Sequence, residues 1–298
     1  MSHAEQLEWE RRAGVPAAVA ALVSALVGMV ALVVANTSVR GQSGDAADGI
    51  VSAHKHLDSI VIAGVLSAIS MLLLAPTLLY LFRATKYRRA QLPEAARYLA
   101  IAGPILFAGG LVGQAFALRD AVNRTFARYP LPPKQAKNLA NDAFTSGAVA
   151  SWSLALLGIG LVVGAAAILI SLNARRAGLL SSFMGITGII VGVLLVVPFV
   201  GRPPIVYFFW AAALGLLYLD RWPGGRGRGA AWETGEEEPW PTTAELRAAE
   251  AAGGRDAKPE REPEEPDADD YEDEDETVGA PAGAQHPRSK KRKRKRRR

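Results

Sequence analysis

Residues 147–172 read GAVASWSLALLGIGLVVGAAAILISL and contain no charged side chain. About 20 apolar residues in a helix are enough to cross the ~30 Å hydrocarbon core of a bilayer. Lipid offers the backbone no hydrogen-bond partner, so a run of this kind must satisfy its own peptide groups as a helix. A helix of a soluble bundle would carry a polar stripe at helical spacing, and this run has none. The stretch therefore predicts a transmembrane helix.

Five further apolar runs surround this one. They lie at residues 15–35, 59–82, 98–118, 178–200 and 205–219. The last run is short, but Tyr207, Trp210 and Tyr218 suit the membrane interface. The first run is too long for a signal-peptide core and follows acidic residues such as Glu5 and Glu8, so we expect it to be retained. The pattern predicts an all-α, polytopic transmembrane bundle of about six spans.

Composition divides the chain into three parts. Residues 1–13 form a short polar segment, residues 14–219 form the predicted bundle, and residues 220–298 form a tail with almost no Leu, Ile or Val. Such a tail buries too little apolar surface to offset the entropy of ordering, so we expect disorder from residue 220 onward. Within the tail, an acidic block at residues 260–276 precedes a basic terminus at residues 288–298.

Basic residues are unevenly divided between the two sets of connections, and this bias sets orientation. One set carries Arg11, Arg12, Arg83, Lys86, Arg88, Arg89, Arg97, Arg175, Arg176, Arg221, Arg226 and Arg228. The other set carries Arg40, Lys55, Arg119, Arg124, Arg128, Lys134, Lys137 and Arg202. The first set is larger, although the connection at residues 119–146 runs against the trend. We therefore expect a protein of the inner cell membrane with both termini in the cytoplasm.

Small residues recur four positions apart within the spans, a spacing that lets transmembrane helices approach closely. The pairs are Ser24 and Gly28, Gly109 and Gly113, Gly160 and Gly164, and Gly188 and Gly192. One interpretation is a dimerisation face. The interpretation that we favour is packing between helices of the same chain, because small residues are common in any transmembrane helix.

Residues that carry chemistry are scarce. No Asp, Glu, Lys, Arg or His lies inside a predicted span, which disfavours a carrier with a charged central site. The chain has 0 Cys and lacks the usual nucleophile, zinc and phosphate-loop motifs. His54 and Asp58 lie one helical turn apart, but two ligands do not make a metal site. We predict no catalytic, cofactor-binding or metal-binding residue and no enzyme activity.

The basic terminus is the strongest electrostatic feature. Its residues are Lys290, Lys291, Arg292, Lys293, Arg294, Lys295, Arg296, Arg297 and Arg298. Three partners compete for it: anionic lipid headgroups, nucleic acid or the ribosome through phosphates, and the chain's own acidic block. We rank lipid contact together with self-association first, because no aromatic residue interrupts the run to stack on bases.

The Ala-, Val- and Gly-rich spans, the preference for Arg over Lys and the charged tail resemble multi-spanning membrane proteins of uncharacterised function from high-GC bacteria. The resemblance rests on architecture and composition over residues 1–219 and implies no functional residue.

The hypothesis that we favour is a non-enzymatic scaffold or interaction protein with an electrostatic cytoplasmic tail. The alternative is a small-molecule transporter or channel subunit, for which a polar cavity between spans would argue.

Overall fold

The computed structural model describes residues 2–37, 56–126, 138, 142, 147–196, 203–222, 227–241, 244–245 and 247–248. The chain separates into two units, Met1–Thr242 and Thr243–Arg298, and the architecture below belongs to the first. The acidic block and the basic residues 290–298 lie outside the described residues.

The described part of the chain is helical and contains no strand. Four long helices are α1 (His3–Thr37), α3 (Leu57–Arg88), α4 (Ala95–Phe126) and α6 (Gly147–Arg176). Each contains a stretch long and apolar enough to cross a membrane. Two shorter apolar helices, α7 (Ser182–Val196) and α8 (Ile205–Tyr218), lie where the fifth and sixth spans were predicted. The predicted all-α membrane bundle is confirmed.

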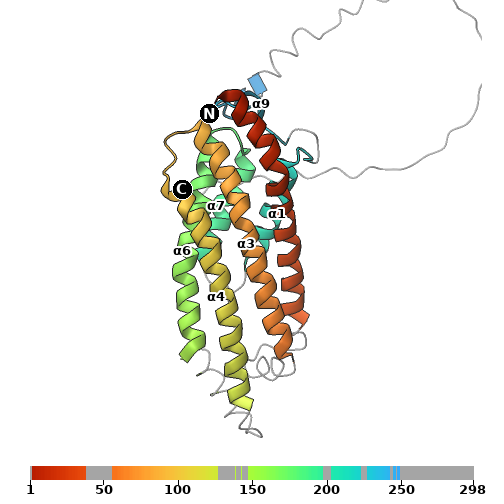
Figure 1. The fold of residues 1–298 in the computed structure, drawn as a ribbon, viewed down its shortest axis with the longest axis vertical. Helices are drawn as coiled ribbons and strands as arrows, with labels where there is room; N and C mark the ends of the chain where they lie inside the picture. Colours follow the sequence, from red (N-terminus) through yellow and green to blue (C-terminus); the bar gives the residue numbers. More distant parts are fainter. Residues whose placement is uncertain are drawn as a thin grey trace, which may run out of the picture. The chain divides into compact units, whose positions relative to one another are not determined.

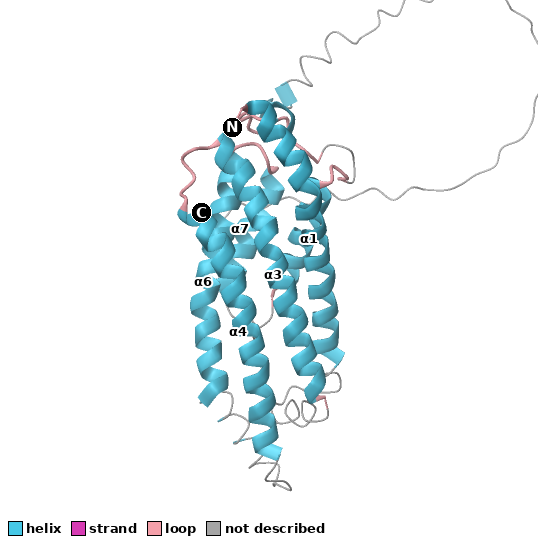
Figure 2. Cartoon of the chain, viewed as in Figure 1, coloured by secondary structure: helices cyan, strands magenta, loops and turns pink. Residues whose placement is uncertain are grey.

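Neighbours in the sequence are mostly neighbours in the bundle. Helix α1 packs on α3, α3 on α4, α4 on α6 and α6 on α7, while α8 returns to pack on α1. Figure 1 shows the long helices lying side by side, and Figure 2 shows the loops that join them at the end nearest the N-terminus. Met71, Leu74, Leu78 and Leu81 of α3 are completely buried, so the centre of the core runs along the second half of this helix.

The bundle turns large apolar side chains outward. Leu154 of α6 is 71% exposed, and Leu26, Val33 and Phe183 are also mostly exposed. A soluble protein rarely leaves so many large apolar side chains exposed to water. In a bilayer the same surface contacts lipid chains, so the exposed side chains and the long apolar helices together mark a membrane protein.

Local sequence explains several helix ends. At the start of α1, the Ser2 backbone N–H donates to the Glu5 carboxylate (2.7 Å) and the Glu5 N–H donates to Ser2 Oγ (3.3 Å), which is a capping box. The bond from the Ser2 backbone lowers the pKa of Glu5. Helix α6 ends at Arg176. Gly178 follows with a φ of 80°, which favours glycine, and the N–H of Leu179 returns to the Ala174 carbonyl (2.9 Å).

Helices α7 and α8 are shorter than the helices around them. The last turn of α7 lies against Gly160, which is well inside α6 rather than at its beginning. Phe208, in the first turn of α8, lies against Gly28, and α1 continues beyond this point to Thr37. Within the described residues, both short helices therefore stop before the ends of α1 and α6 that lie away from the N-terminus.

Candidate functional site

A buried ion pair joins α1 to α3 at the N-terminal end of the bundle. Arg88 Nη1 donates to Glu10 Oε1 at 2.5 Å and Nη2 donates to Oε2 at 3.0 Å. The two side chains are only 0% and 4% exposed. Gln6 Nε2 also donates to Glu10 Oε1 (2.8 Å), and Arg88 Nη1 donates to the Ala84 carbonyl (3.0 Å). A buried pair is tolerated only when its polar atoms find partners in this way.

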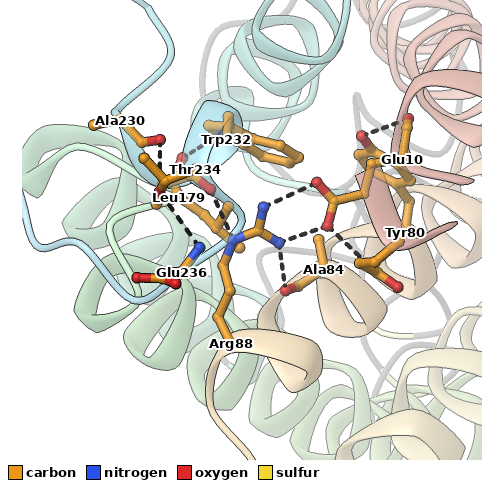
Figure 3. Close-up of polar contacts among 11 residues, drawn as sticks. Glu10, Tyr80, Ala84, Arg88, Leu179, Ala230, Trp232, Thr234 and Glu236 are labelled. Atoms are coloured by element: carbon orange, nitrogen blue, oxygen red, sulfur yellow. Dashed lines mark hydrogen bonds and ion pairs between the residues drawn. The ribbon is translucent and has the colours of Figure 1, made fainter. Parts of the chain in front are cut away.

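The same arginine reaches a segment that follows the last long apolar run. Residues 227–241, called the cap segment below, include the short helix α9 (Ala231–Thr234). Arg88 Nε donates to the Ala231 carbonyl at 2.9 Å. Figure 3 shows the Arg88 guanidinium lying between Glu10 on one side and the cap segment on the other. Three parts of the chain therefore meet at one guanidinium.

Trp232 is the apolar anchor of the cap segment. It is 6% exposed, and its indole N–H donates to the Leu179 carbonyl at 2.8 Å. Its ring stacks on Tyr80, with 5.9 Å between centroids, and meets Tyr218 edge-on at 6.3 Å. The Arg88 guanidinium lies 5.7 Å from the centroid of the indole, within cation–π range. One side chain thus contacts elements that are far apart in the sequence.

Polar contacts hold both ends of the cap segment. Near its beginning, Arg228 donates to the carbonyls of Leu217 (3.1 Å) and Tyr218 (2.6 Å), which end α8. Near its end, the N–H of Glu238 donates to the Ala177 carbonyl at 3.3 Å. Glu237 forms an ion pair with Arg89. The segment is therefore fixed to α8, to α3 and to the turn between α6 and α7.

Residues 227–241 are an exception to the disorder predicted from residue 220 onward. That prediction averaged composition over a long glutamate- and glycine-rich region, whereas a few aromatic side chains decide whether a short segment docks. Trp222, Trp232 and Trp240 are the signal that was overlooked, because large aromatic residues are unusual in a disordered tail. Ala231 is completely buried and Trp222 packs against the core.

A second polar cluster lies deep in the bundle, between α1, α3 and α8. Ser24 Oγ donates to the Ser70 carbonyl (2.7 Å), and Ser70 Oγ donates to the Ser24 carbonyl (2.8 Å). The Tyr207 hydroxyl donates to the Ser70 carbonyl (3.1 Å) and lies 2.6 Å from Ser24 Oγ. Each hydroxyl is buried and bonded to another member of the cluster, so the cluster ties three helices together.

The predicted packing residues are placed in different ways. Ser24 belongs to the hydroxyl cluster, and a Cβ at Gly28 would collide with the Phe208 ring. Gly160 faces the backbone of α7, and Gly164 and Gly192 face each other, so that a Cβ on Gly164 would lie 2.5 Å from the Gly192 carbonyl oxygen.

The remaining three predicted packing residues divide between contact and open space. A Cβ at Gly188 would meet Ser171, and one at Gly113 would lie 2.5 Å from the Trp152 ring. Gly109 has no atom within 4 Å of a Cβ built on it, so it takes no part in helix packing. The face of the helix on which a glycine lies decides whether it packs against a neighbour. Residues 109 and 113 have the expected spacing, but only residue 113 faces a neighbouring helix.

Few other polar groups of the described residues could form a site for a ligand or a metal ion. Gln114 Nε2 donates to Ser153 Oγ at 3.2 Å, which links α4 to α6. The Ser171 hydroxyl is buried without a partner, against the position of Gly188. Among the described residues there is no group of three His, Cys, Asp or Glu side chains placed to hold a metal ion. His54, which was weighed with Asp58 as a ligand, lies outside the described residues.

Comparison with known proteins gives no relative. No family model matches the chain, and no curated protein or solved structure matches it.

Proposed function

We propose that this membrane protein is a non-enzymatic interaction scaffold: a closed helical bundle that holds the base of a charged tail at the cytoplasmic face of the inner membrane. The observation that carries the proposal is that the polar cluster between α1, α3 and α8 is closed on itself. Ser24, Ser70 and Tyr207 use their hydroxyls to join helices. A transport pathway needs polar groups that are open to a solute, and a cluster closed on itself does not supply them.

Close helix packing supports the same proposal. Gly164 and Gly192 bring α6 and α7 into backbone contact, and Gly160 does so one turn further along. No Asp, Glu, Lys, Arg or His of the described residues lies within the apolar stretches of the six helices. Ionisable side chains usually mark ion and substrate pathways in membranes, so their absence from these stretches favours a scaffold over a transporter.

The docked cap segment gives the scaffold a defined attachment for its tail. Through Arg228 and Trp232 it is bound to the end of the bundle, and the tail continues from there. A tail that leaves from a fixed point stays near the membrane surface, where its charges act at high local concentration. The arrangement suits a protein that presents charge to partners at that surface.

The proposed orientation rests on the distribution of arginine. Arg11, Arg97, Arg175, Arg176 and Arg221 are exposed and lie at the helix ends on the side of the N-terminus. Cytoplasmic connections of membrane proteins carry this excess of basic residues. We therefore assign this end to the cytoplasm, with both termini on it.

The proposed partner of the tail is the anionic headgroup layer of the cytoplasmic leaflet. Each basic residue near such a surface contributes about 1 kcal/mol, so the run at residues 290–298 forms a strong electrostatic anchor. Nucleic acid is the competing partner, because phosphates attract the same charges.

The test uses the full chain in nanodiscs of neutral phosphatidylcholine. Its binding to added vesicles is measured by co-flotation, with neutral vesicles, vesicles containing phosphatidylglycerol, and an RNA oligonucleotide as competitor, over a salt series. The matched control lacks residues 290–298. We expect binding only to anionic vesicles, falling with salt and lost in the control.

Two results would contradict the proposed partner. RNA binding tighter than vesicle binding at the same salt would identify a nucleic-acid tether. Binding to neither would mean that the acidic block neutralises the basic terminus, and a scaffold acting through its tail would be ruled out.

A further inference from the structure

The contacts of the cap segment differ in kind from those between the helices. Ala231 and Trp232 are its two buried side chains among the described residues. Its polar contacts include hydrogen bonds to main-chain carbonyls, such as those of Leu217 and Ala177, and the partly exposed ion pair of Arg89 with Glu237. Segments with few buried apolar contacts open more readily than the core that supports them.

The ion pair beneath the cap segment keeps its own bonds without the segment. If the segment undocked, the Glu10–Arg88 pair would keep both of its N–H···O bonds, and Arg88 would keep the Ala84 carbonyl. Within the pair only Arg88 Nε would lose a partner, the Ala231 carbonyl. The carbonyls of Leu179, Leu217, Tyr218 and Ala177 would also lose their donors, and water at this end of the bundle can bind all of these groups. Undocking would therefore leave no charge buried without a partner, which is the usual obstacle to opening a covered ion pair.

We propose that residues 227–241 form a releasable strap, which docks over the Glu10–Arg88 pair and undocks as a unit while the six apolar helices stay packed. The strap precedes the tail in the sequence, so a partner that bound the tail more tightly in one position of the strap would shift the strap toward that position. This inference does not depend on which partner the tail binds. It adds a conformational device to the scaffold.

The absence of cysteine allows a direct test by thiol labelling of the full chain in nanodiscs. Ala231→Cys places a thiol at a buried strap position, and Ala230→Cys places one at its exposed neighbour. Ala96→Cys is the control for the bundle, because Ala96 is completely buried in the first turn of α4, at the same end. A water-soluble maleimide then reports how often each position opens.

We expect Ala231→Cys to label at least tenfold more slowly than Ala230→Cys and at least tenfold faster than Ala96→Cys. Removing the partly exposed ion pair with Glu237→Gln in the Ala231→Cys background should raise the rate by about twofold to fivefold, the range of such pairs. Added salt should act in the same direction, because it screens that pair.

Either extreme overturns the proposal. Labelling of Ala231→Cys as slow as that of Ala96→Cys would mean that the segment opens only with the bundle. Labelling as fast as that of Ala230→Cys would mean that it is not docked. Hydrogen exchange of the unmodified chain supplies an independent measurement, because the amide of Glu238 donates to the Ala177 carbonyl of the bundle only when the segment is docked. Its exchange should be faster than that of the α4 amides, and equal rates would also overturn the proposal.

Discussion

Arg88 is the residue on which the N-terminal end of the bundle converges. Its guanidinium binds Glu10 on α1, its own helix through Ala84, and the cap segment through Ala231. An arginine suits this position because its planar fork offers donors in several fixed directions and always keeps its charge. A lysine would present a single point charge and lose the paired geometry.

Removing one partner of the Glu10–Arg88 pair should destabilise the protein far more than removing both. We expect Arg88→Met to lower the free energy of unfolding by about 3–5 kcal/mol, because the Glu10 carboxylate would remain buried without a cation. The double variant Glu10→Leu with Arg88→Met should recover at least half of that loss. Denaturation in detergent micelles measures both, and a double variant no more stable than the single one would show that the pair itself contributes most of the stability.

At the scale of the helices, much of the fold could be predicted. The runs at residues 15–35, 59–82, 98–118 and 147–172 all lie within the four long helices, because charge-free apolar runs leave a chain in lipid no other structure. The helices extend beyond the runs at their charged ends: α1 begins at His3, where Ser2 and Glu5 cap it. Composition cannot show this, because polar residues continue a helix once it has left the hydrocarbon.

The candidate site could not be predicted in the same way. Glu10 and Arg88 are 78 positions apart, and Ala231 is 143 positions from Arg88. Nothing local in the sequence joins them, since only the antiparallel arrangement of α1 and α3 and the return of the chain after α8 bring them together. Each charge read alone resembles an ordinary residue of a cytoplasmic loop.

Glycine spacing predicts candidates for helix contact, and the structure separates those that face a neighbour from those that face outward. Gly160→Ala should lower stability by about 1–3 kcal/mol, because the new methyl group would meet the Leu195 carbonyl of α7. Gly158→Ala, two positions away, has open space and should be neutral or stabilising by up to about 1 kcal/mol. Thermal unfolding of the two variants compares them directly, and equal losses would contradict this packing of α6 on α7.

Because α7 and α8 are short, we predict that the end of α7 lies inside the membrane rather than at its far surface. Val196 ends α7 beside Gly160, whereas Asn36 and Asp58 are exposed near the far ends of α1 and α3. We expect an impermeant maleimide to label Asn36→Cys and Asp58→Cys from the far side of the membrane and to leave Val196→Cys unlabelled. Rapid labelling of Val196→Cys would show that α7 reaches the far surface.

The whole molecule combines a closed membrane bundle with a tail that continues from one end of it. Burial of the hydroxyl cluster and the close glycine contacts make the bundle a rigid support, while the docked cap segment determines where the tail begins.

Insertion into the membrane should depend on the apolar helices alone. We therefore expect a chain that lacks residues 289–298 to enter the membrane normally, as alkaline extraction of membranes would show. Loss of that variant from the membrane would give the basic terminus a role in biogenesis.

Protease treatment of oriented vesicles tests whether both ends of the chain lie at the cytoplasmic face, as we propose. The full chain carries one epitope tag before Met1 and another after Arg298, and right-side-out vesicles are compared with inverted ones. We predict that protease removes both tags from inverted vesicles and neither from right-side-out vesicles. Removal of the C-terminal tag from right-side-out vesicles would place the tail outside the cell and contradict its proposed contact with the cytoplasmic leaflet.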